Sequence, residues 1–112
     1  MSTITTHVLD VSRGRPAKGI NVTLERVGAP QGTILATAMT DADGRVKAFT
    51  PTLSLQPGTY RLTFNVGAYF TAAEVDAFYP RVVVEFEVRD ATQHYHVPLL
   101  LSPFGYSTYR GS

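Results

Sequence analysis

Three histidines are the side chains of this sequence best suited to acid–base chemistry near neutral pH, because the ordinary pKa of histidine is about 6.5. His94 and His96 are separated by Tyr95, so on a β-strand they would point to the same face. His7 lies near the other end of the chain. One interpretation is that the three histidines bind zinc. The other is that they are hydrogen-bonded and partly buried, which is favoured because no carboxylate stands at ligand spacing.

Arg45 and the end of the chain are the other candidates for a polar site. Arg45 directly follows the Asp43-Gly44 pair, and residues 106–112 read YSTYRGS. Chain ends usually consist of small or polar residues that fray, whereas this one keeps two tyrosines and an arginine. We therefore expect a tail that is held down and used. Arg45 and Arg110 could equally be solvated surface charges. Ser112 carries a hydroxyl and the α-carboxylate of the sequence.

Composition excludes several classes of function. The 112 residues are 44% hydrophobic and 17% charged, which predicts a single globular domain over residues 1–112. The net charge is +1 without a basic cluster, so nucleic acid is not expected as a partner. Cysteine is absent, which excludes disulfides, thiolate metal sites and cysteine nucleophiles. No signal peptide or membrane span is apparent, so we expect a cytoplasmic protein with no membrane partner.

Side chains that alternate between apolar and polar predict β-strands over most of the chain. The pattern is strongest in residues 20–25, 59–66 and 81–89, and such alternation is typical of strands with one buried face. Residues 6–11 also read as a strand. Turn-forming residues separate the segments, with Asp43-Gly44 as the strongest tight-turn signal. Several short strands at this spacing predict an all-β fold, a two-sheet antiparallel sandwich.

One segment departs from the alternating pattern. Residues 71–78 (TAAEVDAF) begin with a threonine followed three residues later by a glutamate, which is the capping-box signature of a helix start. Pro80 would end a helix there. We predict one short helix of about two turns in this segment, packed on the edge of a sheet and without chemistry of its own.

Six motifs, taken in order, resemble the transthyretin-like 5-hydroxyisourate hydrolases. They are HVLD at 7–10, GRPA at 14–17, TDADGR at 40–45, FYP at 78–80, HYHVPLLLSP at 94–103 and YRGS at 109–112. The resemblance extends from about Thr6 to Ser112 without a long insertion. The terminal YRGS is its most specific part, because transthyretins, the hormone carriers of the same fold, lack that ending.

The resemblance implies a transthyretin-like (prealbumin-like) sandwich and a polar site. It implies that His7, Arg45, His96 and Ser112 are catalytic, and that His7, Arg45 and Tyr109 contact the substrate. His94 adjoins the motif and is expected to be structural or supporting. The resemblance also implies a homotetramer, a dimer of dimers, with the sites in a channel between the dimers.

The implied reaction is the ring-opening hydrolysis of 5-hydroxyisourate to 2-oxo-4-hydroxy-4-carboxy-5-ureidoimidazoline in urate catabolism. It belongs to the cyclic amidases (EC 3.5.2 class) and requires no metal or organic cofactor. A neutral histidine would take a proton from water, and Arg45 would stabilise the negative charge that develops on oxygen. His7 would be the base and His96 its partner or proton donor, or the reverse. The alternative is a transthyretin-like carrier that binds a small ligand without converting it.

Overall fold

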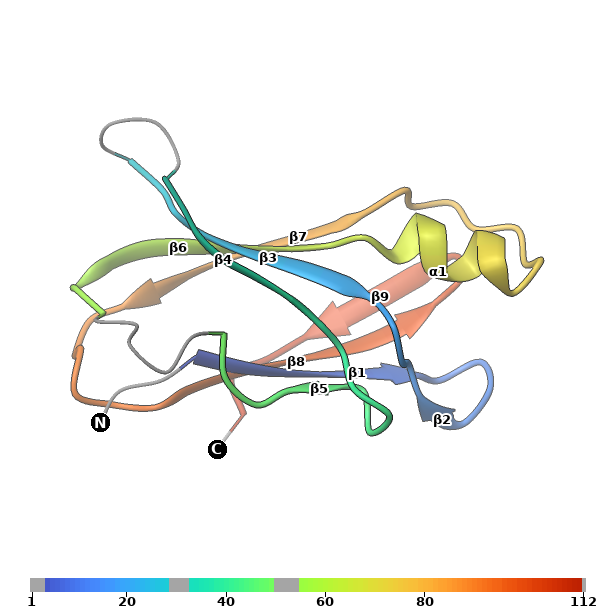
Figure 1. Ribbon diagram of the computed structural model, residues 1–112, viewed down its shortest axis with the longest axis horizontal. Coiled ribbons are helices and arrows are strands. Elements are labelled where there is room, and N and C mark those ends of the chain that lie inside the picture. Colours follow the sequence, from blue (N-terminus) through green and yellow to red (C-terminus); the bar gives the residue numbers. More distant parts are fainter. Residues whose placement is uncertain (1–3, 29–32, 50–54, 112) are drawn as a thin grey trace.

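Two β-sheets packed face to face make up the chain in a computed structural model that describes residues 4–28, 33–49 and 55–111 (Figure 1). The first sheet contains β1 (Ile4–Asp10), β2 (Arg15–Pro16), β5 (Arg45–Val46), β8 (Tyr95–Ser102) and β9 (Gly105–Thr108). The second contains β3 (Asn21–Arg26), β4 (Thr33–Met39), β6 (Gly58–Phe64) and β7 (Val82–Val88). The prediction of an all-β, two-sheet sandwich with a short helix is confirmed.

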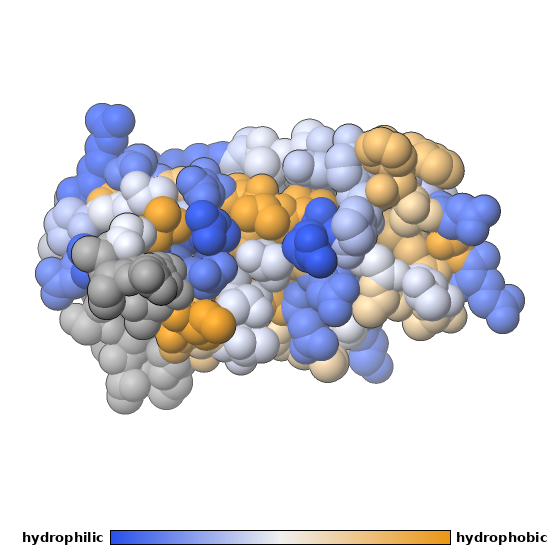
Figure 2. Space-filling model, turned by 90° about the horizontal axis from the view of Figure 1, so that it is seen from above, coloured by the Kyte–Doolittle hydropathy of each residue, from blue (hydrophilic) through white to orange (hydrophobic). Residues whose placement is uncertain are grey.

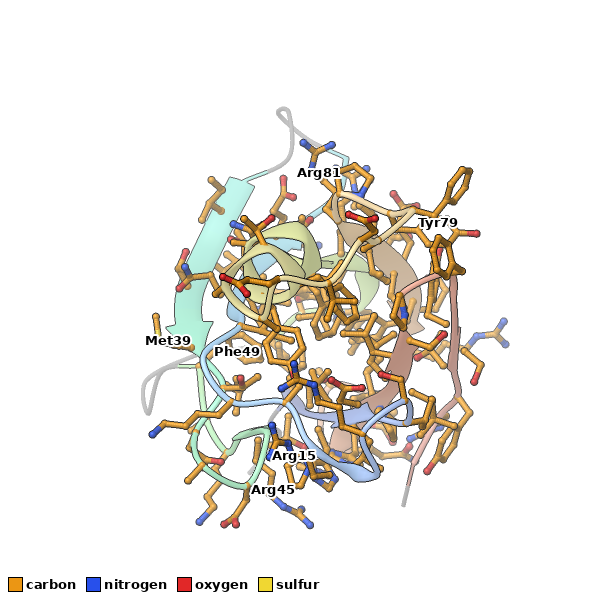
Figure 3. All side chains as sticks on the ribbon, turned by 90° about the vertical axis from the view of Figure 1, so that its right-hand side faces the viewer. Arg15, Met39, Arg45, Phe49, Tyr79 and Arg81 are labelled. Carbon is orange, nitrogen blue, oxygen red and sulfur yellow. The ribbon has the colours of Figure 1, made fainter. Side chains whose placement is uncertain are left out.

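Apolar residues from both sheets fill the space between them, as the alternating pattern predicts. In β1 and β6 every second side chain is buried, and Figure 3 shows the inward side chains meeting between the layers. The residues completely shielded from solvent include Val8, Val22, Leu24, Leu62, Phe64, Val82 and Leu99. Burying each such side chain stabilises the fold by roughly 1.5–3 kcal/mol. Viewed from above in Figure 2, the surface shows apolar residues as patches separated by polar ones.

Strand β1 is central to the first sheet, because β8 pairs with one of its sides and β2 and β5 pair with the other. The β1–β8 pair is parallel over its whole length, from Ile4 opposite Tyr95 to Asp10 opposite Leu101. The other pairs between named strands are antiparallel. A parallel pair needs a long connection, and here the second sheet and the helix supply it.

The helix begins earlier than predicted. α1 spans Val66–Ala72, and the side chain of Asn65 caps it by accepting a hydrogen bond from the Ala68 N–H at 3.5 Å. Val66 was expected at the end of a strand, but Val66 and Phe70 instead form the buried face of this helix. The prediction of a helix over 71–78 is therefore wrong. Only the last two residues of α1, Thr71 and Ala72, lie in that segment.

A Schellman motif explains why the helix stops. The Val75 N–H donates to the Phe70 carbonyl at 2.9 Å and the Glu74 N–H to the Thr71 carbonyl at 3.0 Å, which is the hydrogen-bond pattern of that motif. Glu74 occupies the left-handed position, with a φ of 56°. The glutamate that suggested a capping box thus lies just beyond the C-terminus of the helix. No helix among the described residues has the length and apolar character that a membrane crossing requires.

Candidate active site

Strand register brings His7 and Arg45 together on the outer face of the five-stranded sheet. His7 on β1 lies opposite Arg45 on β5 and, on the other side of β1, opposite Pro98 on β8. Thr5, two residues before His7, lies opposite His96. Because side chains two residues apart share a face of a strand, Thr5 and His7 lie on the same face. His7 is half-buried and Arg45 is exposed.

A tight turn places Arg45 beside His7. The carboxylate of Asp41 accepts hydrogen bonds from the backbone N–H groups of Asp43 and Arg45, at 2.9 and 3.0 Å. Gly44 has a φ of 75°, and its carbonyl accepts a hydrogen bond from the Val8 N–H at 2.8 Å. A Cβ on Gly44 would lie 2.4 Å from the Val8 carbonyl oxygen. Glycine is therefore required both by the backbone conformation and by the close approach to β1.

His96 is half-buried and held at one ring nitrogen. Its Nδ1 lies 2.7 Å from the Thr5 hydroxyl, whose oxygen also lies 3.1 Å from Nε2 of His94. The two imidazole rings are stacked, with centroids 6.4 Å apart and planes at 15°. The prediction that His94 and His96 share a face is confirmed, since Tyr95 and Val97 are buried on the other side.

The environment of His96 favours its neutral form. Burial, followed by the neighbouring His94, His7 and Arg45, lowers the pKa of His96 below its ordinary value of 6.5. Burial and nearby positive charge both disfavour an imidazolium ion. At neutral pH the ring therefore has one nitrogen that donates a hydrogen bond and one that accepts.

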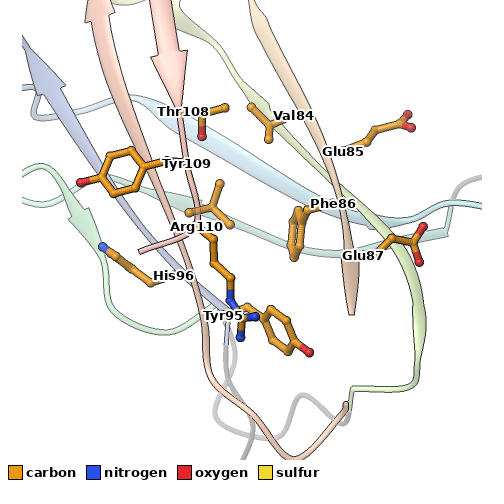
Figure 4. Close-up of a pocket in the computed structure, with 10 residues that line it drawn as sticks. Val84, Glu85, Phe86, Glu87, Tyr95, His96, Thr108, Tyr109 and Arg110 are labelled. Atoms are coloured by element: carbon orange, nitrogen blue, oxygen red, sulfur yellow. The ribbon is translucent and has the colours of Figure 1, made fainter. Parts of the chain in front are cut away.

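The tail returns to this face of the sheet. β9 pairs with β8 up to Thr108 opposite Leu99, and the Gly111 N–H then donates to the His96 carbonyl at 2.8 Å. Figure 4 shows Tyr109 on the same side of these strands as His96, with Arg110 on the other side. There the guanidinium of Arg110 lies 4.6 Å from the centre of the Tyr95 ring, which anchors the tail by a cation–π contact.

The close fit of the tail depends on Gly111. A Cβ at this position would lie 2.6 Å from Cδ2 of His96 and 3.2 Å from Cγ of Pro98, so a larger residue would displace the imidazole. Ser112, the fourth residue predicted to be catalytic, lies outside the described residues. Gly111, its neighbour, is adjacent to His96.

Two depressions meet at His96. One, of about 200 Å³, is lined by Thr5, Thr6, Arg45, Val46, Lys47 and His96. The other, of about 320 Å³, opens between the β7 and β9 edges and includes His96, Tyr109 and Arg110 in its lining. The first contains Arg45 and His96, two of the residues predicted to be catalytic, and so is the better candidate for chemistry. Within the described part of the chain, no group of three or more histidines and carboxylates is arranged to hold a metal.

The structure thus places His7 and Arg45 near His96, and Tyr109 beside His96 in the second depression. All four residues were named from the sequence. Thr5 and Lys47 were missed. The signal for Thr5 was present, because it precedes His7 by two residues on an alternating strand. The contact between Thr5 and His96 was not foreseeable, because it depends on the register of two strands that are far apart in the sequence.

Comparison with known proteins gives consistent results. The sequence model of the HIUase/Transthyretin family matches residues 4–111. A 5-hydroxyisourate hydrolase of Salmonella dublin is 48% identical over 97% of this chain and 80% of its own length. The structure of Klebsiella pneumoniae 5-hydroxyisourate hydrolase superposes with a TM-score of 0.87 at 41% identity, covering 98% of this chain and 99% of the other. Sea bream transthyretin in complex with thyroxine superposes with a TM-score of 0.90 at 30% identity, covering 97% and 94%.

Proposed function

Because this chain belongs to the HIUase/Transthyretin family, we propose that it hydrolyses 5-hydroxyisourate to 2-oxo-4-hydroxy-4-carboxy-5-ureidoimidazoline. The observation that carries the proposal is the polar site formed by His7, Arg45 and His96, in a chain similar over its length to proteins named 5-hydroxyisourate hydrolase. The reaction opens a six-membered ring at an amide-like bond. It needs an activated water and a stabiliser for the charge that develops on the carbonyl oxygen.

His7 is the proposed base. It takes a proton from water while the water oxygen attacks the ring carbonyl, which gives a tetrahedral intermediate with a negatively charged oxygen. The proton on His7 then passes to the ring nitrogen as the carbon–nitrogen bond breaks, so the imidazole returns to its neutral form. The new carboxyl group loses its proton to solvent.

Arg45 and His96 are proposed to stabilise the oxyanion. The guanidinium of Arg45 is permanently charged and offers a rigid set of donors for an oxygen or for an anionic, urate-like ring. His96 is kept neutral by burial and by nearby positive charge, and a neutral imidazole can still donate one hydrogen bond. These donors are worth most where water is excluded.

The tail completes the proposed site. Tyr109 lies on the His96 side of β8 and β9 (Figure 4), where its ring can contact a flat heterocycle. Ser112 follows Gly111, whose backbone is bonded to His96, so we propose that its hydroxyl orients the water or the substrate.

We also propose that the active form is a homotetramer, a dimer of dimers. β7 and β9 are exposed sheet edges in the single chain, and edges of this kind are commonly covered by pairing with another chain. Large aromatic side chains near these edges are exposed, including Phe78 at 70%, Phe104 at 71% and Tyr109 at 58%. Aromatic residues are enriched at protein interfaces. A partner across the outer face would exclude water from His7 and Arg45.

A carrier of small ligands is the alternative, since one structural relative is a transthyretin in complex with thyroxine. The polar site favours hydrolysis, because carriers of apolar ligands line their pockets with apolar side chains. The site in this chain instead gathers two histidines and an arginine on one face.

An ultraviolet time course of freshly made 5-hydroxyisourate separates the two functions. The protein should accelerate loss of the absorbance above the spontaneous rate, and His7→Ala and Arg45→Ala should each lower kcat/KM by at least about 100-fold. Lys18→Ala, on the loop between β2 and β3, is the matched control and should retain wild-type activity. Decay at the spontaneous rate with the wild-type protein would contradict the proposed function. Sedimentation of the same samples should give a species of four chains, and a single-chain species would refute the tetramer.

A further inference from the structure

We infer that Thr5 is a positioning residue: its hydroxyl, placed between His94 and His96, selects the tautomer of His96 that carries its proton on Nε2. The effect of Thr5 on catalysis rests on the proposed function, whereas the tautomer of His96 does not. The observation behind the inference is that one hydroxyl oxygen lies within hydrogen-bond distance of two imidazole nitrogens, at 2.7 Å from His96 Nδ1 and 3.1 Å from His94 Nε2.

A proton count limits the possible arrangements. A threonine hydroxyl has one proton to donate and lone pairs that accept, and each neutral imidazole has one donor and one acceptor nitrogen. If Thr5 donates to His96, it accepts from His94, and His96 presents Nε2–H to the site. If Thr5 donates to His94, it accepts from Nδ1–H of His96, and His96 presents a bare Nε2. In a third arrangement Thr5 accepts from both rings and donates its own proton elsewhere, and His96 again presents a bare Nε2.

The two distances favour the first arrangement. Hydrogen bonds donated by a hydroxyl are typically about 0.2 Å shorter than those donated by a ring or backbone N–H. The contact to His96 is the shorter one, at 2.7 Å, which fits Thr5 as the donor. The contact to His94, at 3.1 Å, fits an N–H donating to the hydroxyl oxygen.

The neighbouring groups agree with this assignment. His7 and Arg45 face His96 from β1 and β5, His94 is stacked on it, and Lys47 lines the same depression. The positive charges of Arg45 and Lys47 disfavour a second proton on His96. With Nδ1 occupied by the Thr5 hydroxyl, the one remaining proton lies on Nε2. His96 is then a neutral hydrogen-bond donor, and His7 is left as the base.

Nitrogen-15 NMR of the imidazoles tests the inference directly on the unliganded protein. In the wild type, His96 should be protonated on Nε2, and its Nδ1 resonance should be that of a hydrogen-bonded acceptor. Thr5→Val has nearly the same shape but no hydroxyl, so the Nδ1 resonance should shift to that of a free acceptor and the second tautomer should appear. Thr5→Ser should restore the wild-type spectrum. A proton on Nδ1 in the wild type, or identical spectra for Thr5→Val and the wild type, would overturn the inference.

Kinetics supply the catalytic readout. Thr5→Val should lower kcat about tenfold or more with little change in KM, because the lost contact orients a group that acts in the transition state. Thr5→Ser should recover activity to within about threefold of wild type. Thr63→Val, at a half-buried strand threonine in the other sheet, is the matched control and should keep wild-type kcat. Wild-type kcat in Thr5→Val would refute the positioning role. If the wild-type protein fails to convert 5-hydroxyisourate, only the proposed function fails, and the NMR result still decides the tautomer.

Discussion

At the scale of single residues, the site depends on how charges are placed around one half-buried ring. His96 lies within the influence of His94, His7 and Arg45, and its pKa is lowered, first by burial and then by these neighbours. Arg45 is exposed, whereas His96 is half-buried. The arginine therefore acts on the imidazole mainly through its charge, and the effect of that charge can be measured without any substrate.

Arg45→Gln should raise the pKa of His96 toward its ordinary value. The guanidinium disfavours the imidazolium, so removing the charge makes protonation easier. An NMR titration of the His96 ring measures the change. Arg45→Lys keeps the charge and should leave the titration close to that of the wild type. A pKa of His96 that does not move in Arg45→Gln would show that the charge of Arg45 does not help to keep His96 neutral.

At the scale of elements, local backbone conformation decides where the functional side chains lie. The turn at residues 41–45 needs a glycine at Gly44 to approach β1, and this approach sets Arg45 opposite His7. Helix α1 contrasts with this turn, because a residue other than glycine has a positive φ at its C-terminus. Its C-terminal Schellman motif places Glu74, which is not glycine, at a φ of 56°. A side chain in this conformation costs roughly 1–2 kcal/mol.

Glu74→Gly should therefore stabilise the protein by about 0.5–1 kcal/mol, because glycine adopts a positive φ without this strain. Urea unfolding measures the gain. Ala72→Gly, at the exposed last residue of the same helix, is the control and should destabilise the protein by up to about 1 kcal/mol. A loss of stability in Glu74→Gly would contradict the strain argument.

At the scale of the whole molecule, a buried polar network joins the helix to the site-bearing sheet. The carboxylate of Asp10, at the end of β1, accepts hydrogen bonds from the Tyr69 hydroxyl at 2.7 Å and the Ser12 hydroxyl at 2.6 Å. Burial acts to raise the pKa of Asp10, but these hydrogen bonds, with the backbone N–H and charge of Arg13, together lower it below the ordinary 3.8. Burial and the bond to Asp10 raise the pKa of Tyr69 to about 12.

Tyr69→Phe should destabilise the protein by about 1.5–3 kcal/mol at neutral pH, because the buried carboxylate loses a donor. Since the pKa of Asp10 is lowered by folding, its contribution is complete above pH 3.8 and is lost as the pH falls below that value. The difference in free energy of unfolding between Tyr69→Phe and the wild type should therefore become smaller in acid. Thermal unfolding from pH 7 to pH 3 measures it, with Tyr106→Phe, whose side chain is 41% exposed, as control. If the stability difference between Tyr69→Phe and the wild type were constant across this pH range, the loss of stability would not arise from the Asp10 carboxylate.

Much of the fold and most of the candidate site could be predicted from the sequence. Alternation identified β3, β6 and β7, because the two-residue period of a strand is a local property of the side chains. The motifs named His7, Arg45, His96 and Tyr109 before their positions were known. The helix was misplaced because the prediction relied on the threonine–glutamate pair in residues 71–78. The true N-cap is Asn65, and the structure identifies it because Val66 and Phe70, which follow it, form the buried face of the helix.

The sequence by itself determined which side chains can do chemistry and which face of the alternating strands β3, β6 and β7 is buried, because side-chain type and strand period are local. Only the tertiary structure decided that β1 and β8 run parallel, that Arg45 lies opposite His7 and that one threonine hydroxyl contacts two histidines. These contacts join residues up to 91 positions apart. Their register is set by how two sheets pack around a shared core, and no local pattern in the chain encodes that.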